Sequence, residues 1–215
     1  LLAIDTSVCG TVGANLDEIA KLDPVRIIGE TLIAVHHQLV ARPEVRSPAV
    51  TTVLAHPKAF EECAHWLARH LPNALRVPLP SSAAAAEQAV AEASGKTAAI
   101  ASKTAADLYR LKILAADIEN SPMNTTRFWA FGREIPPPTG HDQTTLLVTG
   151  DLNAALAALV NAKMEILSIY ERSSGGKIDA RFYFLDLAGH VAAPLLSRLL
   201  RRFPEGRWLG SYPRA

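Results

Sequence analysis

The sequence predicts a two-part protein, with an α/β region over residues 1–133 and an α+β unit over 144–215. Three observations lead to this prediction. In the first part, short β-rich runs alternate with helical patterns, which favours α/β layers around a largely parallel sheet. In the second part the order becomes βαββαβ, the ferredoxin-like arrangement. Between them, residues 134–143 contain three consecutive prolines and a glycine, which interrupt helices and inner strands and therefore indicate a linker.

In the first region, β-rich runs predict the strands, and start signals and helical spacing predict the helices. "LLAID" at residues 1–5 is typical of a buried strand already under way, so we expect the sequence to begin inside a domain. Pro57 opens a helix in which Cys63 and Leu67 recur near helical spacing, and Ser81 or Ser82 caps the next helix. The predicted elements are strands at 1–5, 25–35, 50–56, 74–79, 97–102 and 128–131, and helices at 58–71, 83–93 and 103–115.

The second region alternates its strands and helices in a different order. Its apolar runs have the lengths of strands and short helices, and "SSGGK" is typical of a hairpin turn. The predicted elements are strands at 144–150, 164–171, 179–187 and 206–210, helices at 152–163 and 191–203, and a turn at 173–177.

Composition excludes several classes of function. Apolar residues make up 49% of the 215 residues, the formal net charge is +1, and no run of basic residues indicates nucleic-acid binding. The apolar runs are shorter than the roughly 20 residues of a membrane helix. Cys9 and Cys63 lie far apart and form no metal-binding motif, which favours a reducing, cytoplasmic location. Neighbours on a strand face opposite ways, so His36 and His37 make a poor chelate, and no metal site is predicted.

Hydroxyl side chains recur at the predicted starts of helices and strands. Together with one or two cations, such groups suit a small polycarboxylate, although a Ser or Thr before a helix is more often a simple cap. The segment 125–127 has two interpretations: a polar turn that enters a strand, or an anion site whose hydroxyl donates to a leaving group. The groups are Ser7 and Thr11 beside Gly10 and Gly13, Ser81-Ser82, Ser102-Lys103-Thr104 and Thr125-Thr126-Arg127.

Several motifs, taken in order, resemble a known family. "LAHPKAFEECAHWL", "PSSAAAAEQAV", "AAIASKTAADLYRLKIL" and "NTTRFWAFGRE" closely resemble prephenate dehydratase. "TTLLVTG", "AALAAL", "SIYERS" and "FYFLDLAGH" are similar to its C-terminal ACT regulatory domain. "LLAIDTSVCGTV" looks like a segment that follows the family's opening strand and glycine-rich stretch, some 70 residues that are missing here.

The resemblance implies a two-lobed catalytic region, like type 2 periplasmic binding proteins, with substrate in the cleft. The implied reaction converts prephenate to phenylpyruvate with loss of carbon dioxide and water, on the route to phenylalanine, without metal or organic cofactor. By the family pattern, Thr126 is the catalytic hydroxyl and Arg127 is its neighbouring cation. The residues expected to bind substrate are Thr6, Ser7, His56, Lys58, Ser81, Ser82, Thr125 and Phe128.

The sequence departs from the family pattern at both expected sites. The family has Asn, Ser and Gln where this chain has Thr6, Ala55 and Glu62. A carboxylate near a dianion is unfavourable unless Lys58 or a proton compensates it, or else Glu62 is a catalytic acid with a raised pKa. The expected effector residues also differ. The family's Gly-Ala-Leu motif is Ala154-Ala155-Leu156 in this chain, and the segment that corresponds to its Glu-Ser-Arg-Pro motif begins with Glu171-Arg172.

Three functions therefore stand as alternatives. Prephenate dehydratase, a carbon–oxygen lyase, comes first. A decarboxylase that loses only carbon dioxide and leaves the ring non-aromatic comes second, and a catalytically silent paralogue that binds an aromatic ligand comes third. L-Phenylalanine is the expected effector, with weakened control because a methyl at Ala154 crowds the ligand. We expect a homodimer or homotetramer. Whether a chorismate mutase domain or a targeting segment precedes residue 1 stays an open question.

Overall fold

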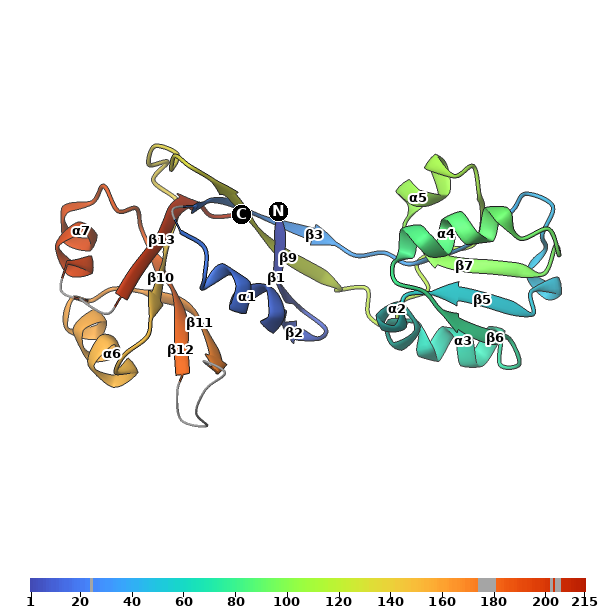
Figure 1. Ribbon diagram of the computed structural model, residues 1–215, viewed down its shortest axis with the longest axis horizontal. Coiled ribbons are helices and arrows are strands. Elements are labelled where there is room, and N and C mark those ends of the chain that lie inside the picture. The colour runs from blue at the N-terminus through green and yellow to red at the C-terminus, as the bar shows by residue number, and fades with distance from the viewer. Residues whose placement is uncertain (24, 174–180, 202, 204–205) are drawn as a thin grey trace. The chain divides into compact units, whose positions relative to one another are not determined.

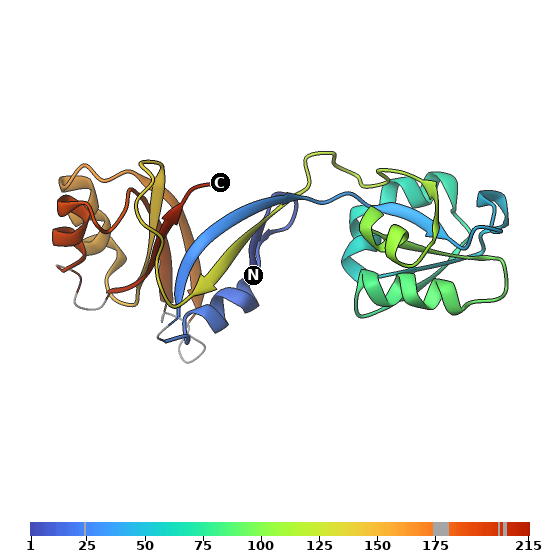
Figure 2. The same ribbon diagram turned by 90° about the horizontal axis from the view of Figure 1, so that it is seen from above.

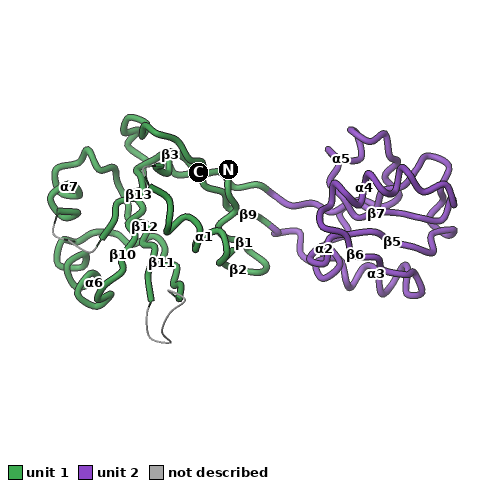
Figure 3. Tube along the Cα trace, in the orientation of Figure 1, with its two compact units in different colours: residues 1–33, 125–215 green, residues 34–124 purple. Residues whose placement is uncertain are grey.

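The computed structural model describes all residues except 24, 174–180, 202 and 204–205. The predicted turn at 173–177 therefore lies almost entirely outside the described residues. The chain divides into two compact units (Figure 3). Unit 1 comprises residues 1–33 and 125–215, and unit 2 comprises residues 34–124. These boundaries differ from those of the predicted domains because both ends of the first region pack with the C-terminal sheet.

Unit 2 contains a five-stranded sheet in the order β6-β5-β7-β4-β8. It is mixed rather than largely parallel as predicted: β5 runs parallel to β6 and β7, whereas β4 is antiparallel to both β7 and β8. A parallel neighbour needs a crossover connection, and no helix precedes β4 within the unit. The strands are β4 (Gln38–Ala41), β5 (Thr52–Ala55), β6 (Leu75–Pro78), β7 (Thr97–Ala101) and β8 (Lys112–Ala115).

Two of the three predicted helices of unit 2 are shorter than expected. The helix at 58–71 is interrupted at Cys63, whose φ of −111° and ψ of 11° are not helical. The helix at 103–115 ends early because Arg110 adopts a positive φ of 54° and the Leu111 amide closes back on the Ala106 carbonyl at 2.8 Å. The helices are α2 (Pro57–Glu62), α3 (Ala64–His70), α4 (Ser82–Ala91) and α5 (Lys103–Leu108), with a 3₁₀ turn at Ser47–Ala49.

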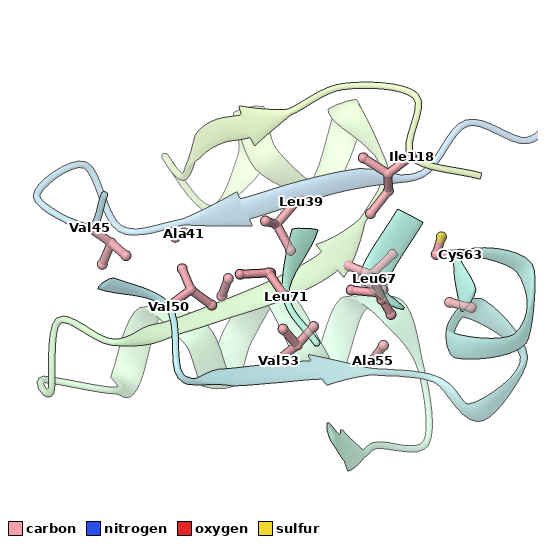
Figure 4. Packing of buried hydrophobic residues seen from close by; sticks show 13 residues of the cluster. Leu39, Ala41, Val45, Val50, Val53, Ala55, Cys63, Leu67, Leu71 and Ile118 are labelled. Atoms are coloured by element: carbon pink, nitrogen blue, oxygen red, sulfur yellow. The ribbon is translucent and has the colours of Figure 1, made fainter. Parts of the chain in front are cut away.

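Side chains along the strands of unit 2 point alternately to the two faces of the sheet, so the sheet has a core on each face. One face carries Leu39, Val53 and Ile100 against Cys63 and Leu67, as Figure 4 shows for most of the cluster. The other face packs against α4 and α5, and alanines supply much of both surfaces. Small side chains let these helices lie close to the sheet, which explains the alanine-rich sequence of α4. Cys63 is buried in the first core.

The first sheet of unit 1 has the order β2-β1-β9-β3 and carries helix α1. Strand β9 includes Thr125, Thr126 and Arg127, so these residues lie within the strand and not in a turn before it. Thr126 is directly opposite Thr6 in the antiparallel pair of β9 and β1. The elements are β1 (Leu2–Thr6), β2 (Gly10–Thr11), α1 (Gly13–Ile19), β3 (Arg26–Ala34) and β9 (Thr125–Gly132).

The second sheet of unit 1 follows the predicted βαββαβ order. Its strands lie in the order β11-β12-β10-β13 and every described neighbouring pair is antiparallel, which is the ferredoxin-like pattern. Leu146, Leu159 and Leu196 belong to the core between this sheet and its two helices. The elements are β10 (Asp142–Val148), α6 (Leu152–Asn161), β11 (Ile166–Ser173), β12 (Arg181–Ala188), α7 (Pro194–Leu200) and β13 (Gly206–Pro213).

The two sheets of unit 1 share a core on the face of the second sheet that lies away from α6 and α7 (Figures 1 and 2). Ile4, Ile27 and Trp129 from the first sheet belong to the same buried cluster as Phe184 and Tyr212 from the second. The backbones approach closely at one point, where a Cβ on Gly210 of β13 would lie 2.0 Å from the carbonyl oxygen of Ile27 in β3. Only glycine fits there.

We therefore expect Gly210→Ala to lower the free energy of unfolding by about 2 kcal/mol or more, because backbone atoms must move to relieve the clash. Gly29→Ala in β3 is the matched control, since a Cβ there would meet the Cβ of Ala130 at an ordinary 3.9 Å. Urea unfolding of both variants measures the effect. Equal stability of the two variants would contradict the close approach of the sheets.

A carboxylate organises the turn between the prolines and β10. Asp142 accepts hydrogen bonds from the Thr139 amide and hydroxyl, both at 2.8 Å, and from the Gly140 amide at 2.9 Å. Burial acts to raise the pKa of Asp142, but these hydrogen bonds outweigh it and the pKa is lowered overall. Asp142 already belongs to β10, so this strand begins inside the segment that was predicted as linker.

A lowered folded-state pKa means that Asp142 stabilises the fold above its unfolded pKa, and that this contribution is lost as pH falls through the folded value. We expect Asp142→Asn to lose about 1–3 kcal/mol at neutral pH. The difference from wild type should shrink below about pH 4. Denaturant melts between pH 3 and pH 7 measure it, and a difference that stays constant across this range would contradict the assignment.

Candidate active site

Four residues expected at the active site meet at one end of the β1–β9 pair. Thr6 and Thr126 are opposite each other in the register, so their side chains share a face of the sheet. Beyond them, the Ser7 amide donates to the Thr125 carbonyl and the Thr125 amide donates to the Ser7 hydroxyl, both at 2.9 Å. Thr6 is buried, and its hydroxyl accepts from the Cys9 amide at 3.0 Å. Ser7 and Thr125, which are 118 positions apart in the sequence, are thus brought together where β1 and β9 pair.

Arg127 lies next to Thr126 in β9, but adjacent side chains of a strand point to opposite faces. Its guanidinium is 14% exposed and donates from Nε to Glu30 at 2.6 Å, and from one terminal nitrogen to Tyr170 at 2.6 Å and Asp186 at 2.8 Å. Burial acts to lower the pKa of Arg127, yet Asp186 and the other acceptors raise it overall. Glu30, Tyr170 and Asp186 carried no recognisable signal in the sequence, because each reaches Arg127 only through tertiary packing.

Phe128 shares the face of Thr126, two residues further along β9. It is opposite Ala3 of β1 and is partly buried. The strand therefore sorts the predicted site residues, with Thr126 and Phe128 on one side and Arg127 on the other.

In unit 2, the other predicted substrate-binding residues follow the carboxyl ends of parallel strands. Strands β5, β6 and β7 end at one edge of the sheet and lead into α2, α4 and α5. His56 caps α2 by accepting the Lys58 amide at 3.2 Å, and Ser81 caps α4 by accepting the Ala84 amide at 3.0 Å. Ser102 caps α5 in the same way. Local capping thus accounts for the position of these groups, and their contact with substrate stays a prediction.

Glu62 is buried and has a partner that the sequence analysis did not foresee. The Nε2 atom of His37 lies 2.6 Å from its carboxylate. Lys58 was one candidate to compensate this charge, and the group that lies beside the carboxylate is the imidazole of His37. The side chain of the neighbouring His36 instead faces Glu119 at 2.9 Å, so the two imidazoles have different partners, although both residues lie between β3 and β4 and not within a strand as the sequence argument assumed. The pair of Glu62 and His37 comes from residues 25 positions apart, which no local pattern reveals.

One group of side chains in unit 2 has the composition of a cation site. The ligand atoms of His36, Asp117 and Glu119 lie within 4.8 Å of one another. The hydrogen bond to Glu119 raises the pKa of His36, so an ion pair already accounts for the arrangement.

The residues expected at the effector site lie on α6 and β11. Ala154 is exposed in the first turn of α6, whose Asp151 cap accepts the Asn153 amide at 2.8 Å, whereas Ala155 is buried. Leu156 packs partly buried against the core under α6. Glu171 and Arg172 of β11 are engaged in ion pairs.

Those ion pairs have different consequences. Glu171 contacts Arg181 of the adjacent strand at 2.7 Å. Arg172 forms a two-pronged pair with Asp17 of α1, both contacts at 2.8 Å, and this hydrogen-bonded pair lowers the pKa of Asp17. A Cβ on Gly13 would lie 2.4 Å from the Arg172 guanidinium, so this glycine makes room for an arginine of the second sheet.

Comparison with known proteins shows the family to which this chain belongs. The arrangement is a mixed α/β protein with three sheets, in which hydroxyl groups gather at one end of the β1–β9 pair. The family profile described as Prephenate dehydratase matches residues 1–136. The chain belongs to the prephenate dehydratase family. No helix among the described residues has the length and apolar character needed to cross a membrane.

Individual relatives are similar along nearly the whole chain. A bifunctional chorismate mutase/prephenate dehydratase of Stutzerimonas stutzeri is 33% identical over all of this chain, which spans 60% of that protein. A prephenate dehydratase of Mycobacterium sp. (strain JLS) is 36% identical over 98% of this chain and 69% of its own length. The crystal structure of prephenate dehydratase from Arthrobacter aurescens in complex with L-Phe matches with a TM-score of 0.85 and 34% identity, covering 98% of this chain and 76% of that one.

Proposed function

We propose that the protein is a prephenate dehydratase, which converts prephenate to phenylpyruvate, carbon dioxide and water. The observation that carries the proposal is the cluster of Thr6, Thr125 and Thr126 on β1 and β9 with Ser7 just after β1, inside the segment that matches the family. In this reaction the bond between the ring and its carboxylate breaks, and its electron pair moves into the ring. The bond to the ring hydroxyl then breaks, and hydroxide leaves as the ring becomes aromatic.

The protein's task in this reaction is to bind a dianion and to assist the leaving hydroxide. We assign the assistance to the Thr126 hydroxyl, which donates a hydrogen bond to the departing oxygen. Threonine is a poor acid in water, so the benefit comes from a positioned donor in a site without competing water. In unit 2, His56, Lys58, Ser81 and Ser82 lie at helix starts, where the helix dipole favours anions, and their contact with the carboxylates of the substrate stays a prediction.

Glu62 is the main departure from the expected chemistry. A buried carboxylate disfavours a dianion nearby unless a cation or a proton offsets it. Lys58 is one candidate for such a cation, and the structure places His37 at 2.6 Å from the carboxylate. We therefore retain Glu62 as a candidate acid, with His37 as its hydrogen-bonding partner.

We expect Thr126→Val to lower kcat by about 10²–10³-fold, because valine keeps the branched shape that suits a strand and removes only the hydroxyl. Thr126→Ser, which keeps a hydroxyl, should retain a substantial part of the activity and is the matched control. Formation of phenylpyruvate from prephenate by the full-length protein, followed by absorbance, measures both. Full activity of the valine variant would remove Thr126 from the mechanism.

The products separate the three candidate functions. Phenylpyruvate establishes the dehydratase. A decarboxylated product that keeps its ring hydroxyl assigns the protein to the non-aromatising decarboxylases, for which the substitutions at Thr6, Ala55 and Glu62 are the supporting observation. Binding of prephenate without consumption assigns it to the silent paralogues. Mass spectrometry of the reaction mixture distinguishes these outcomes directly.

We further propose that residues 144–215 form an ACT-type regulatory domain that binds L-phenylalanine, and that the protein is a homodimer or a larger homo-oligomer. The ferredoxin-like order of the second sheet and the related structure in complex with L-Phe support this proposal. The family's glycine is Ala154 here, and its methyl crowds a ligand that must touch the backbone.

We therefore expect Ala154→Gly to bind L-phenylalanine more tightly than wild type, as measured by titration calorimetry. Ala157→Gly, at an exposed position of the same helix, is the control for the loss of helix stability, about 1 kcal/mol, that glycine brings. Unchanged affinity in Ala154→Gly would exclude this residue as the cause of weak binding.

A further inference from the structure

We propose that Arg127 is a positioning residue, which anchors the strand of Thr126 to the C-terminal sheet, and that Asp186 of that sheet is its essential partner. The inference rests on the proposed function, in which Thr126 is the catalytic hydroxyl. It gives the regulatory part of the chain a direct role in the geometry of the active site.

The first step of the argument concerns the direction in which Arg127 points. Thr126 faces Thr6 across the strand pair, and the next side chain of the strand lies on the opposite face. On that face the guanidinium lies 5.7 Å from the centroid of the Trp129 ring, which belongs to the core between the two sheets. Arg127 therefore points away from the hydroxyl group that we assign to catalysis.

The second step concerns how fully the guanidinium is engaged. Each of its three nitrogen atoms contacts an acceptor: Nε and one terminal nitrogen reach Glu30, and the other terminal nitrogen reaches Tyr170 and Asp186. Two carboxylates beside one guanidinium make this surrounding unfavourable for a further dianion. The planar guanidinium is held at both of its terminal nitrogens, so its orientation is defined. A lysine cannot reproduce this orientation.

The third step concerns what holds Asp186 in place. It is fully buried, and its second oxygen accepts a hydrogen bond from the Thr145 hydroxyl at 2.6 Å. That hydroxyl lies 2.7 Å from the Tyr212 hydroxyl, so β10, β12 and β13 all contribute to the network. On the other side, Gln143 donates to Glu30 at 2.9 Å. The network joins Arg127 to strands of both sheets through partners that are themselves fixed.

These observations define the role. A displacement of the strand by as little as 1 Å can cost about 100-fold in rate when it moves a catalytic group. Loss of the Asp186 charge leaves Arg127 with one carboxylate, on its own sheet, and removes the charged contact to the second sheet. Because Arg127 lies on the far side of the strand from Thr126, the loss should affect kcat and leave substrate binding nearly unchanged.

The test compares Asp186→Asn with Asp142→Asn in the full-length protein. Both variants remove a buried carboxylate from the same unit, but Asp142 lies outside the network. We expect Asp186→Asn to lower kcat by about 10–100-fold with KM within about twofold of wild type, and Asp142→Asn to keep its kcat at neutral pH. Arg127→Lys should behave like Asp186→Asn. A near-normal kcat in Asp186→Asn, or a tenfold rise of KM in Arg127→Lys, would overturn the proposal.

Hydrogen exchange of the β9 amides, followed by mass spectrometry, tests the anchor independently of turnover. We expect faster exchange over residues 125–132 in Asp186→Asn and not in Asp142→Asn, and the measurement also shows whether each variant is folded. If wild type does not consume prephenate, the proposed function fails, and the exchange data still decide whether Asp186 anchors the strand. Unchanged exchange in a folded Asp186→Asn variant would refute the anchor.

Discussion

The contact between the two sheets of unit 1 is the constraint on which the rest of the structure depends. It buries an aromatic core around Trp129 and Phe184, and it allows no side chain at Gly210. Beside this apolar core lies a cluster of charged residues, Arg127 with Glu30 and Asp186. A buried charge is tolerated only when its partners are placed accurately, and we infer that the ionic network selects the alignment of the sheets in which the strand of Thr126 is held.

Much of this fold could be predicted because local patterns determined it. The βαββαβ order of the second sheet followed from alternating runs of ordinary length, and Ser81 and His56 cap helices where the sequence indicated helix starts. The early end of α5 was missed because apolar residues near 113 fit a helix and a strand equally well, and only pairing with β4 decides between them. The antiparallel direction of β4 was missed because strand direction depends on chain connections that composition does not report.

The candidate site, like the fold, could be predicted only in part. Family resemblance indicated Thr126, and strand pairing in the structure places Thr6, Ser7 and Thr125 beside it. The partners of the charged residues could not be predicted, because His37, Glu30 and Asp186 lie 25, 97 and 59 positions from the groups they contact. Such pairs form across sheets and between segments, and periodicity within a single segment carries no information about them.

The order of the segments along the chain has a consequence for synthesis. Unit 1 is discontinuous, since its first sheet combines β1 and β3 with β9, a strand that follows the whole of unit 2. A ribosome releases the chain from its N-terminus, so unit 2, residues 34–124, is complete and able to fold while β1 and β3 still lack their neighbour. Strand β13, the edge strand of the second sheet that approaches β3 at Gly210, emerges last. Before the second sheet is complete, the apolar faces of the first strands lack the surface that covers them in the folded unit, and exposed apolar strands of this kind favour aggregation.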